Sequence, residues 1–100
     1  VIILVAVDGA YGMEKSAQQR QFGREAPWFG HDHAPVRYDQ VAIAMGCHGE
    51  FVETVAELRP ALERSAAAGK PAVIHVVVDP DANVDPPGNW LWAAARSGKM

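Results

Sequence analysis

Asp8 is the residue whose type and position most directly indicate chemistry. It follows the apolar run Val1–Val7 and precedes Gly9, so a carboxylate stands where a buried strand turns. In open α/β sheets, ligands bind in the crevice beyond the carboxyl ends of the parallel strands. Carboxylate oxygens are ligands that Mg²⁺ accepts readily. Asp8 is therefore a candidate metal ligand, although an Asp-Gly pair after a strand also forms ordinary turns.

A second group of potential ligands, His31, Asp32 and His33, lies in a segment that glycine and proline interrupt. Histidine and aspartate both bind metals, but no further ligand follows at a recognised metal-site spacing. We expect residues 22–37 to form a long surface loop, which in compact domains is usually functional or mobile. Its aromatic residues, such as Trp28, would pack on a subunit, another domain or a substrate.

Cationic side chains follow the turn after Asp8. Residues 12–21 are rich in helix formers, so we expect a short polar helix whose N-terminus faces the ligand region and favours anions. Lys15, Arg20 and Arg24 could there face an anion such as a carboxylate. A solvated polar face is the alternative for each of them.

The elements that position these residues follow from hydrophobic periodicity. A continuous apolar, β-branched run predicts a central parallel strand at Ala72–Val78, with His75 as a hydrogen-bonded core residue. Asp79 ends this strand on the ligand side of the sheet, where it could also form a turn.

Two helices and a short strand are expected between the apolar strands. Apolar spacing predicts a helix over Tyr38–Met45 that ends at Gly46, and then a strand over Glu50–Glu53, with His48 in the turn between them. Thr54 and Glu57 have capping-box spacing for the next helix, which ends at Gly69. Pro60 should separate or kink its first turn.

The order of these elements predicts the fold class: α/β, with a parallel sheet and helices on both faces. We expect residues 1–80 to be the C-terminal portion of such a domain, cut within it, because a strand as apolar as Val1–Val7 needs sheet neighbours on both sides. We expect residues 81–100 to form a tail with a short helix at Trp90–Ala95.

Composition excludes several classes of protein. The 100 residues are 49% hydrophobic and 21% charged, which is typical of a folded globular domain. A net charge of −3 offers no basic surface for nucleic acid or an acidic membrane. No apolar run reaches the roughly 20 residues of a membrane span. The lone Cys47 fits a reducing compartment, so we expect a cytoplasmic protein.

The segment Val7–Met13, VDGAYGM, resembles the element Asn-Asn-Gly-x-Tyr-Gly that follows an apolar strand in thiamine-diphosphate-dependent enzymes of the acetolactate synthase and 2-keto acid decarboxylase superfamily. Val7 and Asp8 stand in the places of the two Asn residues. The resemblance implies that the Asp8 side chain and the Ala10 carbonyl bind Mg²⁺. It also implies that the cofactor-binding residues are Asp8, Gly9, Ala10, Tyr11, Gly12 and Met13.

The resemblance extends through Arg37-Tyr38-Asp39, Gly49–Thr54 and Gly69–Pro80, in the order found at the end of the diphosphate-binding domain of such enzymes. It implies a thiamine-diphosphate-binding fold that is incomplete at its N-terminus. The cofactors would be thiamine diphosphate and Mg²⁺. The partners would be a small keto acid or acyl-CoA substrate, the rest of the same polypeptide, and further copies in a dimer or tetramer.

The implied function is part of an enzyme that makes or breaks a C–C bond next to a carbonyl, as acetolactate synthase does. The alternatives are a 2-hydroxyacyl-CoA or oxalyl-CoA lyase and, outside enzymes, an α/β binding or assembly module. The resemblance implies no catalytic residue in this segment, and the family's Gly-Asp-Gly motif and activating glutamate are absent from these 100 residues. We therefore expect the 100 residues alone to be catalytically inactive.

Overall fold

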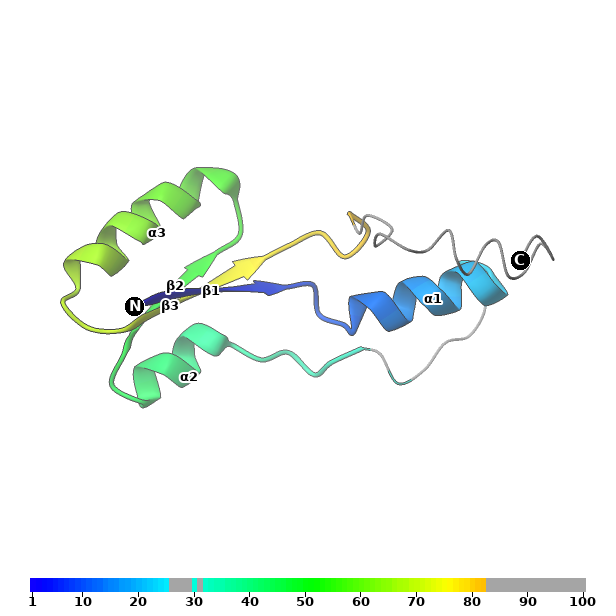
Figure 1. The fold of residues 1–100 in the computed structure, drawn as a ribbon, viewed down its shortest axis with the longest axis horizontal. Coiled ribbons are helices and arrows are strands. Elements are labelled where there is room, and N and C mark those ends of the chain that lie inside the picture. The colour runs from blue at the N-terminus through cyan, green and yellow to red at the C-terminus, as the bar shows by residue number, and fades with distance from the viewer. Residues whose placement is uncertain (26–29, 31, 83–100) are drawn as a thin grey trace, which may run out of the picture.

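Three parallel strands form the sheet at the centre of the molecule (Figure 1). They are β1 (Ile2–Val7), β2 (His48–Val52) and β3 (Ala72–Val77), in the order β1-β3-β2. The computed structural model describes residues 1–25, 30 and 32–82. The predicted parallel pairing of the two apolar strands is confirmed. Trp28, His31 and the predicted tail helix lie outside the described residues.

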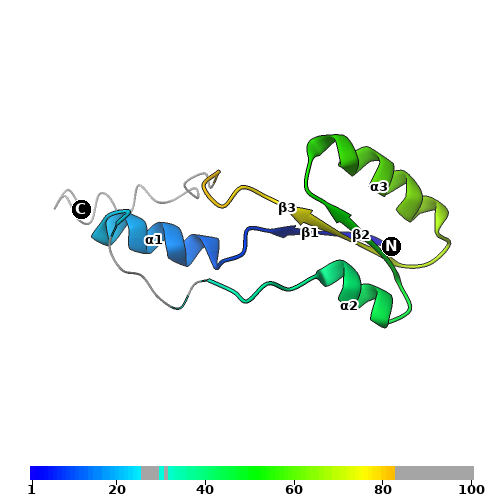
Figure 2. The same ribbon diagram turned by 180° about the vertical axis from the view of Figure 1, so that it is seen from behind.

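Helices cover both faces of the sheet, as expected. α2 (Tyr38–Ala44) and α3 (Val55–Ala67) lie on opposite faces (Figures 1 and 2). α1 (Gly12–Phe22) projects beyond the carboxyl ends of the strands, and none of its residues is buried. The result is a three-layer α/β arrangement, which confirms the predicted fold class. No helix in the described ranges is both long enough and apolar enough to cross a membrane.

The hydrophobic core lies between α3 and the sheet. Ile74 of β3, Val52 of β2 and Ala61 of α3 are at most 2% exposed, and the partly buried Leu58 and Leu62 pack against them. On the opposite face, Gly49 lets α2 approach closely, because a Cβ at this position would collide with the backbone carbonyl of Asp39. The tightest packing therefore surrounds β2 and β3.

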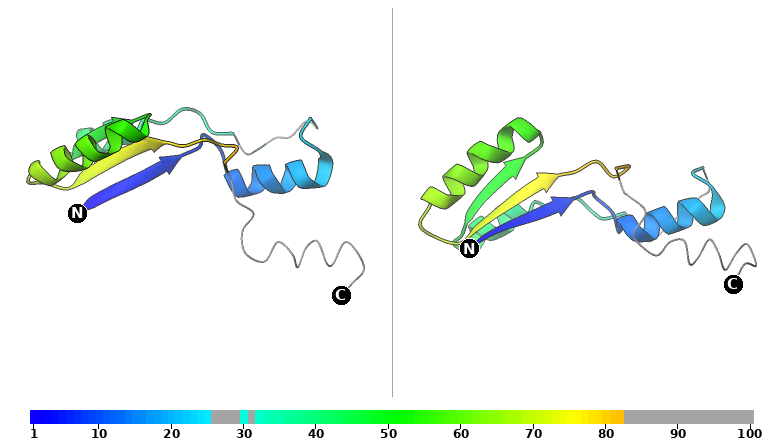
Figure 3. Two further views of the ribbon diagram at one scale, coloured as in Figure 1. Left: turned by 90° about the horizontal axis from the view of Figure 1, so that it is seen from above. Right: turned by 45° about the horizontal axis from the view of Figure 1, so that its top comes forward.

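β1 differs from this pattern and corrects one expectation. Its run of apolar residues predicts burial on both faces, yet Ile3 is 52% and Leu4 is 49% exposed. In Figure 3, α3 lies over β2, while β1 runs along the opposite edge of the sheet. Among the described residues, β1 pairs only with β3. The apolar strand is thus an uncovered edge strand here rather than a central one.

The signals at helix ends were mostly correct. Glu57 Oε2 accepts hydrogen bonds from the backbone N–H groups of Thr54 (2.9 Å) and Glu53 (3.0 Å), which confirms the capping box. Gly46 and Gly69 follow the helices with φ of 84° and 67°, the left-handed conformation that glycine adopts without strain.

Two local expectations need correction. α3 runs as one helix through Pro60, so its first turn is not separate, while a kink at this proline stays a prediction. Proline removes only one N–H from the helix, and packing of the following turns on the sheet outweighs this loss. His48 lies in β2 rather than in a turn, because the pairing with β3 begins at the register pair His48↔Ala72.

Candidate functional site

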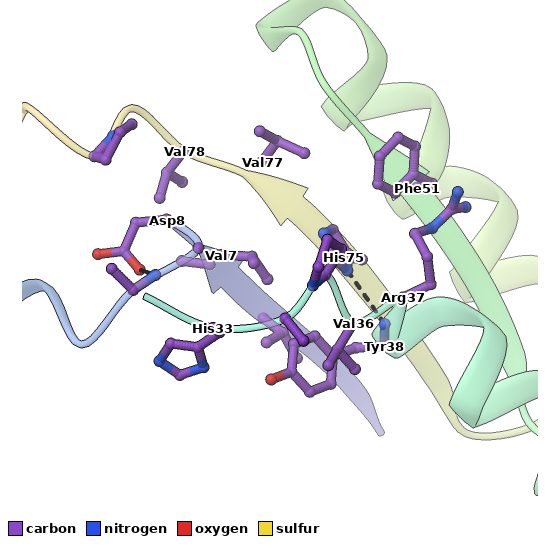
Figure 4. Close-up of a pocket in the computed structure, with 17 residues that line it drawn as sticks. Val7, Asp8, His33, Val36, Arg37, Tyr38, Phe51, His75, Val77 and Val78 are labelled. Carbon is purple, nitrogen blue, oxygen red and sulfur yellow. Dashed lines mark hydrogen bonds between the residues drawn. The ribbon is translucent and has the colours of Figure 1, made fainter. Parts of the chain in front are cut away.

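A crevice of about 480 Å³ lies at the carboxyl ends of β1 and β3 (Figure 4). Its floor consists of Val5 and Val7 of β1 and His75 and Val77 of β3, whose side chains share one face of the sheet. Residues 33–37, which precede α2, form the opposite wall. The crevice occupies the position at which α/β sheets bind ligands.

Asp8 lines one end of this crevice, directly after β1. Its Oδ1 accepts a hydrogen bond from the Ala10 backbone N–H at 3.1 Å, which closes a tight turn. Gly9, inside the turn, has a φ of 75°, which an L side chain rarely adopts. The sequence therefore produces a carboxylate that is held by its own turn at the sheet edge.

The other predicted cofactor-binding residues follow on the same loop. Tyr11 is 61% exposed and Met13 is 72% exposed, while α1 begins at Gly12. The structure thus brings together Asp8, Gly9 and Ala10 at the crevice. Tyr11 and Met13 do not line the crevice, although Tyr11 packs on His33, which does.

The predicted loop passes directly beside the Asp8 turn. Asp32 pairs with Ala10 in an isolated antiparallel bridge, and the His33 N–H donates to the Gly9 carbonyl at 2.9 Å. The His33 ring packs on Tyr11, with ring centroids 4.3 Å apart. This contact between the loop and the turn was not predicted, because no sequence signal pairs two irregular segments.

Two roles were considered for this region: anion binding by Lys15 and metal binding by His31, Asp32 and His33. Lys15 Nζ lies 3.8 Å from Asp32 Oδ1, so a predicted anion-binding residue faces a carboxylate of the loop. No three His, Cys, Asp or Glu side chains gather into a metal-binding group within the described part of the chain. The His33 side chain is exposed and its ring packs on Tyr11, as expected for a surface loop.

An ion pair that the sequence reading missed closes the far end of the crevice. Arg37 donates from Nε to Asp39 Oδ1 (2.8 Å) and from the terminal nitrogen to Oδ2 (2.6 Å), and its Cζ lies 3.8 Å from the centroid of the Phe51 ring. These bonds from Arg37 lower the pKa of the buried Asp39 carboxyl to about 2. The Arg-x-Asp spacing at the start of a helix was the available signal.

His75 and Asp79 behave as the sequence indicated. His75 is 4% exposed, and its Nδ1 accepts the backbone N–H of Tyr38 at 3.2 Å, so it is a hydrogen-bonded core histidine (Figure 4). Asp79 Oδ1 accepts the backbone N–H of Asp81 at 2.8 Å. Asp79 therefore forms a turn, which is one of the two roles expected for it.

The family follows from a comparison with known proteins. Residues 1–76 match the model of the thiamine pyrophosphate enzyme C-terminal TPP-binding domain. The chain belongs to this family. The match confirms the resemblance and explains the parallel three-stranded sheet, which is part of the TPP-binding α/β fold.

Relatives of this TPP-binding domain include two kinds of enzyme. A probable acetolactate synthase of Mycobacterium bovis and an acetolactate synthase large subunit of Mycobacterium tuberculosis are each 41% identical over 80 residues, or 80% of this chain. A 2-hydroxyacyl-CoA lyase of Oryza sativa subsp. japonica is 33% identical over 106 positions, which cover 100% of this chain. The chain spans 14% to 16% of the length of these relatives.

The residues present at the crevice fit a magnesium ion. The Asp8 carboxylate and the Ala10 carbonyl belong to one turn at the end of β1. Both supply hard oxygen donors, and Mg²⁺ is typically bound in proteins by one or two carboxylates together with phosphate oxygens of a ligand. Because Asp8 Oδ1 already accepts the Ala10 N–H, Oδ2 is the carboxylate oxygen suited to a cation.

Proposed function

We propose that this TPP-binding domain belongs to an enzyme that uses thiamine diphosphate and Mg²⁺ to make or break a C–C bond next to a carbonyl. The observation that carries the proposal is the position of Asp8, at the tip of β1 and in the crevice of a chain that matches the family over residues 1–76. The crevice would receive the diphosphate end of the cofactor.

The roles of the residues in this segment concern binding rather than chemistry. We assign Asp8 Oδ2 and the Ala10 carbonyl as Mg²⁺ ligands, with Gly9, Tyr11, Gly12 and Met13 forming the rest of the cofactor-binding loop. When bound, thiamine diphosphate supplies an electron sink for the carbanion that forms next to the carbonyl. Asp8, unlike a neutral amide, adds a negative charge, which strengthens attraction to the cation and repels the diphosphate.

The substrate would be a 2-keto acid or an acyl-CoA. Sequence identity favours the 2-keto acid. The two acetolactate synthases are 41% identical to this chain, whereas the two 2-hydroxyacyl-CoA lyases are 33% and 35% identical. Assaying the full-length protein with pyruvate and with a 2-hydroxyacyl-CoA would separate the two. C–C bond cleavage of the 2-hydroxyacyl-CoA, without activity on pyruvate, would show that the protein is a 2-hydroxyacyl-CoA lyase.

The whole protein would be a cytoplasmic homo-oligomer, either a dimer or a tetramer. Cys47 is the single cysteine and has no disulfide partner, which suits a reducing compartment. Exposed apolar side chains, including Met45 at 78% and Val55 at 92%, offer surface for subunit or domain contacts. Sedimentation of the full-length protein would establish its subunit number.

Substitution of Asp8 tests the proposed function. We expect Asp8→Ala in the full-length protein to weaken Mg²⁺-dependent binding of thiamine diphosphate by about tenfold or more, since a charged metal ligand is lost. Asp8→Asn, which restores an amide oxygen, should retain most of the binding. Titration calorimetry with the cofactor and Mg²⁺ measures both effects.

Asp79→Ala is the matched control, because Asp79 is also an aspartate that follows a parallel strand and closes a turn. Its effect on cofactor affinity should stay within about twofold. Absence of thiamine diphosphate binding by the unmodified full-length protein would contradict the proposal and would favour a binding or assembly module instead.

A further inference from the structure

Residues 32–38 form a connection between the Asp8 turn and the start of α2, and we call this segment the strut. It lines the crevice along most of its length, and Figure 4 shows it passing below the ends of β1 and β3. Pro35 fixes its own φ and restricts the preceding Ala34 to extended conformations. Pro35 therefore limits how far the strut can bend at its middle.

One end of the strut holds the Asp8 turn. The peptide group between Gly9 and Ala10 is bound at both of its polar atoms: its N–H donates to Asp8 Oδ1 at 3.1 Å, and its carbonyl accepts the His33 N–H at 2.9 Å. Because a peptide group is planar, fixing both atoms fixes its orientation. That orientation in turn determines where Asp8 Oδ2 and the following Ala10 carbonyl lie.

The other end of the strut is bound to the buried sheet. The Tyr38 N–H donates to His75 Nδ1 at 3.2 Å, and His75 is 4% exposed in the central strand. A ring nitrogen that accepts a hydrogen bond carries no proton, which places the ring proton of a neutral histidine on Nε2. The Phe51 ring packs on the His75 ring, with their centroids 5.0 Å apart. Arg37 Cζ lies 3.8 Å from the centroid of the same Phe51 ring, so Phe51 links His75 to the strut.

We propose that His75 is a positioning residue for the Asp8 turn and acts on it through the strut. This inference rests on the proposed function, because it concerns the oxygen atoms assigned to Mg²⁺. His75 fixes where Tyr38 and the strut begin, and the strut brings the His33 N–H to the Gly9–Ala10 peptide. Contacts behind the ligands of a metal typically change its affinity by about 10–100-fold when they are lost.

Three substitutions in the full-length protein separate positioning from stability. His75→Leu keeps an apolar side chain but removes the acceptor, so the Tyr38 N–H loses its partner. His75→Asn places Oδ1 one bond beyond Cγ, where Nδ1 stands, and restores an acceptor. Ile74→Val is the control, because Ile74 is the neighbour of His75 in β3 and is buried in the core under α3.

The first measurement is hydrogen exchange without metal or cofactor. In His75→Leu we expect exchange at residues 9–11 and at the His33 and Tyr38 amides to become at least about threefold faster, while α3 keeps its protection. His75→Asn should restore slow exchange at the Asp8 turn. Ile74→Val should act on α3 and β3 instead. Unchanged exchange at residues 9–11 in His75→Leu would overturn the proposal.

The second measurement is the Mg²⁺ dissociation constant at saturating thiamine diphosphate. We expect it to rise about tenfold in His75→Leu and to stay within about threefold of the unmodified protein in His75→Asn and Ile74→Val. Equal weakening in His75→Leu and Ile74→Val would show that lost stability is the cause and would overturn the positioning role. So would His75→Asn binding as weakly as His75→Leu.

These outcomes separate this proposal from the proposed function. If the unmodified protein binds no Mg²⁺ with thiamine diphosphate, the function is wrong, and the exchange data alone decide whether His75 controls the Asp8 turn. If His75→Leu does not fold, His33→Pro tests the other end of the strut, because proline has no N–H to donate to the Gly9 carbonyl. Faster exchange at residues 9–11 in His33→Pro supports the strut, and unchanged exchange there overturns it.

Discussion

Two strands of nearly the same composition have opposite surroundings in this molecule. β1 and β3 are both apolar, lie side by side and pair Leu4 with Ile74, so these two side chains share one face of the sheet. Ile74 is 0% exposed, whereas Leu4 is 49% exposed. In the described part of the chain, β3 has a strand on each edge and packs against α3, whereas β1 pairs on one edge and α3 lies mainly over β2 (Figure 3).

The comparison shows that the Asp8 turn lies on the less covered half of the molecule. β2, β3, α2 and α3 bury one another, but the strand that ends in Asp8 exposes an apolar surface to water, which is unfavourable by about 25 cal/mol for each Å². The acetolactate synthase relatives are far longer, since this chain covers 14% of their length. We expect other parts of the full-length protein to cover β1 and to complete the site.

The largest expected effect is the loss of function when the 100 residues are separated from the rest of the protein. Without a cover over β1, the isolated segment should show no thiamine-diphosphate turnover. It should also bind an apolar dye such as ANS more strongly, per mole, than the full-length protein does. Parallel assays of both proteins measure the two effects. Turnover by the isolated segment would contradict this prediction.

A matched pair of substitutions tests whether β1 is covered in the full-length protein. Ile74→Ala should lower the free energy of unfolding by about 2–5 kcal/mol, since it leaves a cavity in the core. Leu4→Ala should cost about as much if other parts of the protein cover β1, although Leu4 is half exposed here. Urea unfolding of both variants gives the comparison. A cost for Leu4→Ala below about 0.5 kcal/mol would show that β1 remains an exposed edge.

The same contrast explains which parts of the fold could be predicted. Local sequence signals were sufficient to predict the strand at Ala72–Val77, the capping box at Thr54 and the end of a helix at Gly46. The prediction that β1 is buried on both faces was wrong for this segment. An apolar run shows that a strand requires covering neighbours, but it does not show which neighbours are present. His48 joined β2 for a similar reason, since pairing with β3 determined where the strand begins.

The site could be predicted only in part. The turn at Asp8 followed from one contiguous motif, and the structure places it at the crevice. The contacts that hold the turn come from distant residues: the His33 N–H reaches Gly9, and His75 anchors Tyr38 from the far end of the chain. Such pairs depend on the path of a loop in space, which no local propensity determines.

On the covered half, the Arg37–Asp39 ion pair should make the free energy of unfolding depend on pH. The pKa of Asp39 is lowered to about 2 from an ordinary value of 3.8, chiefly by the hydrogen bonds from Arg37. The stabilisation is therefore present above pH 3.8 and is lost as the pH falls through about 2. We expect Asp39→Asn to cost about 2 kcal/mol at pH 7 and little near pH 2.

Unfolding of the unmodified protein and of Asp39→Asn at several pH values measures this dependence. Glu53→Gln is the control, because Glu53 is exposed and its charge near Arg37 contributes less than that of Asp39. A stability difference between Asp39→Asn and the unmodified protein that stays constant from pH 7 to pH 2 would show that the carboxylate charge is not its source.

The smallest effect should come from the exposed ion pair between Lys15 of α1 and Asp32 of the loop, on the less covered half. Lys15 and Asp32 are 3.8 Å apart, and the Asp32 side chain is 69% exposed, so water and salt screen their attraction. Lys15→Met should change the free energy of unfolding by less than about 0.5 kcal/mol. Arg64→Met should cost more, because it removes two hydrogen bonds to Glu50, whose side chain is 12% exposed. If Lys15→Met is as costly as Arg64→Met in urea unfolding, α1 is packed in the full-length protein, and the contrast between the two halves holds only for this segment.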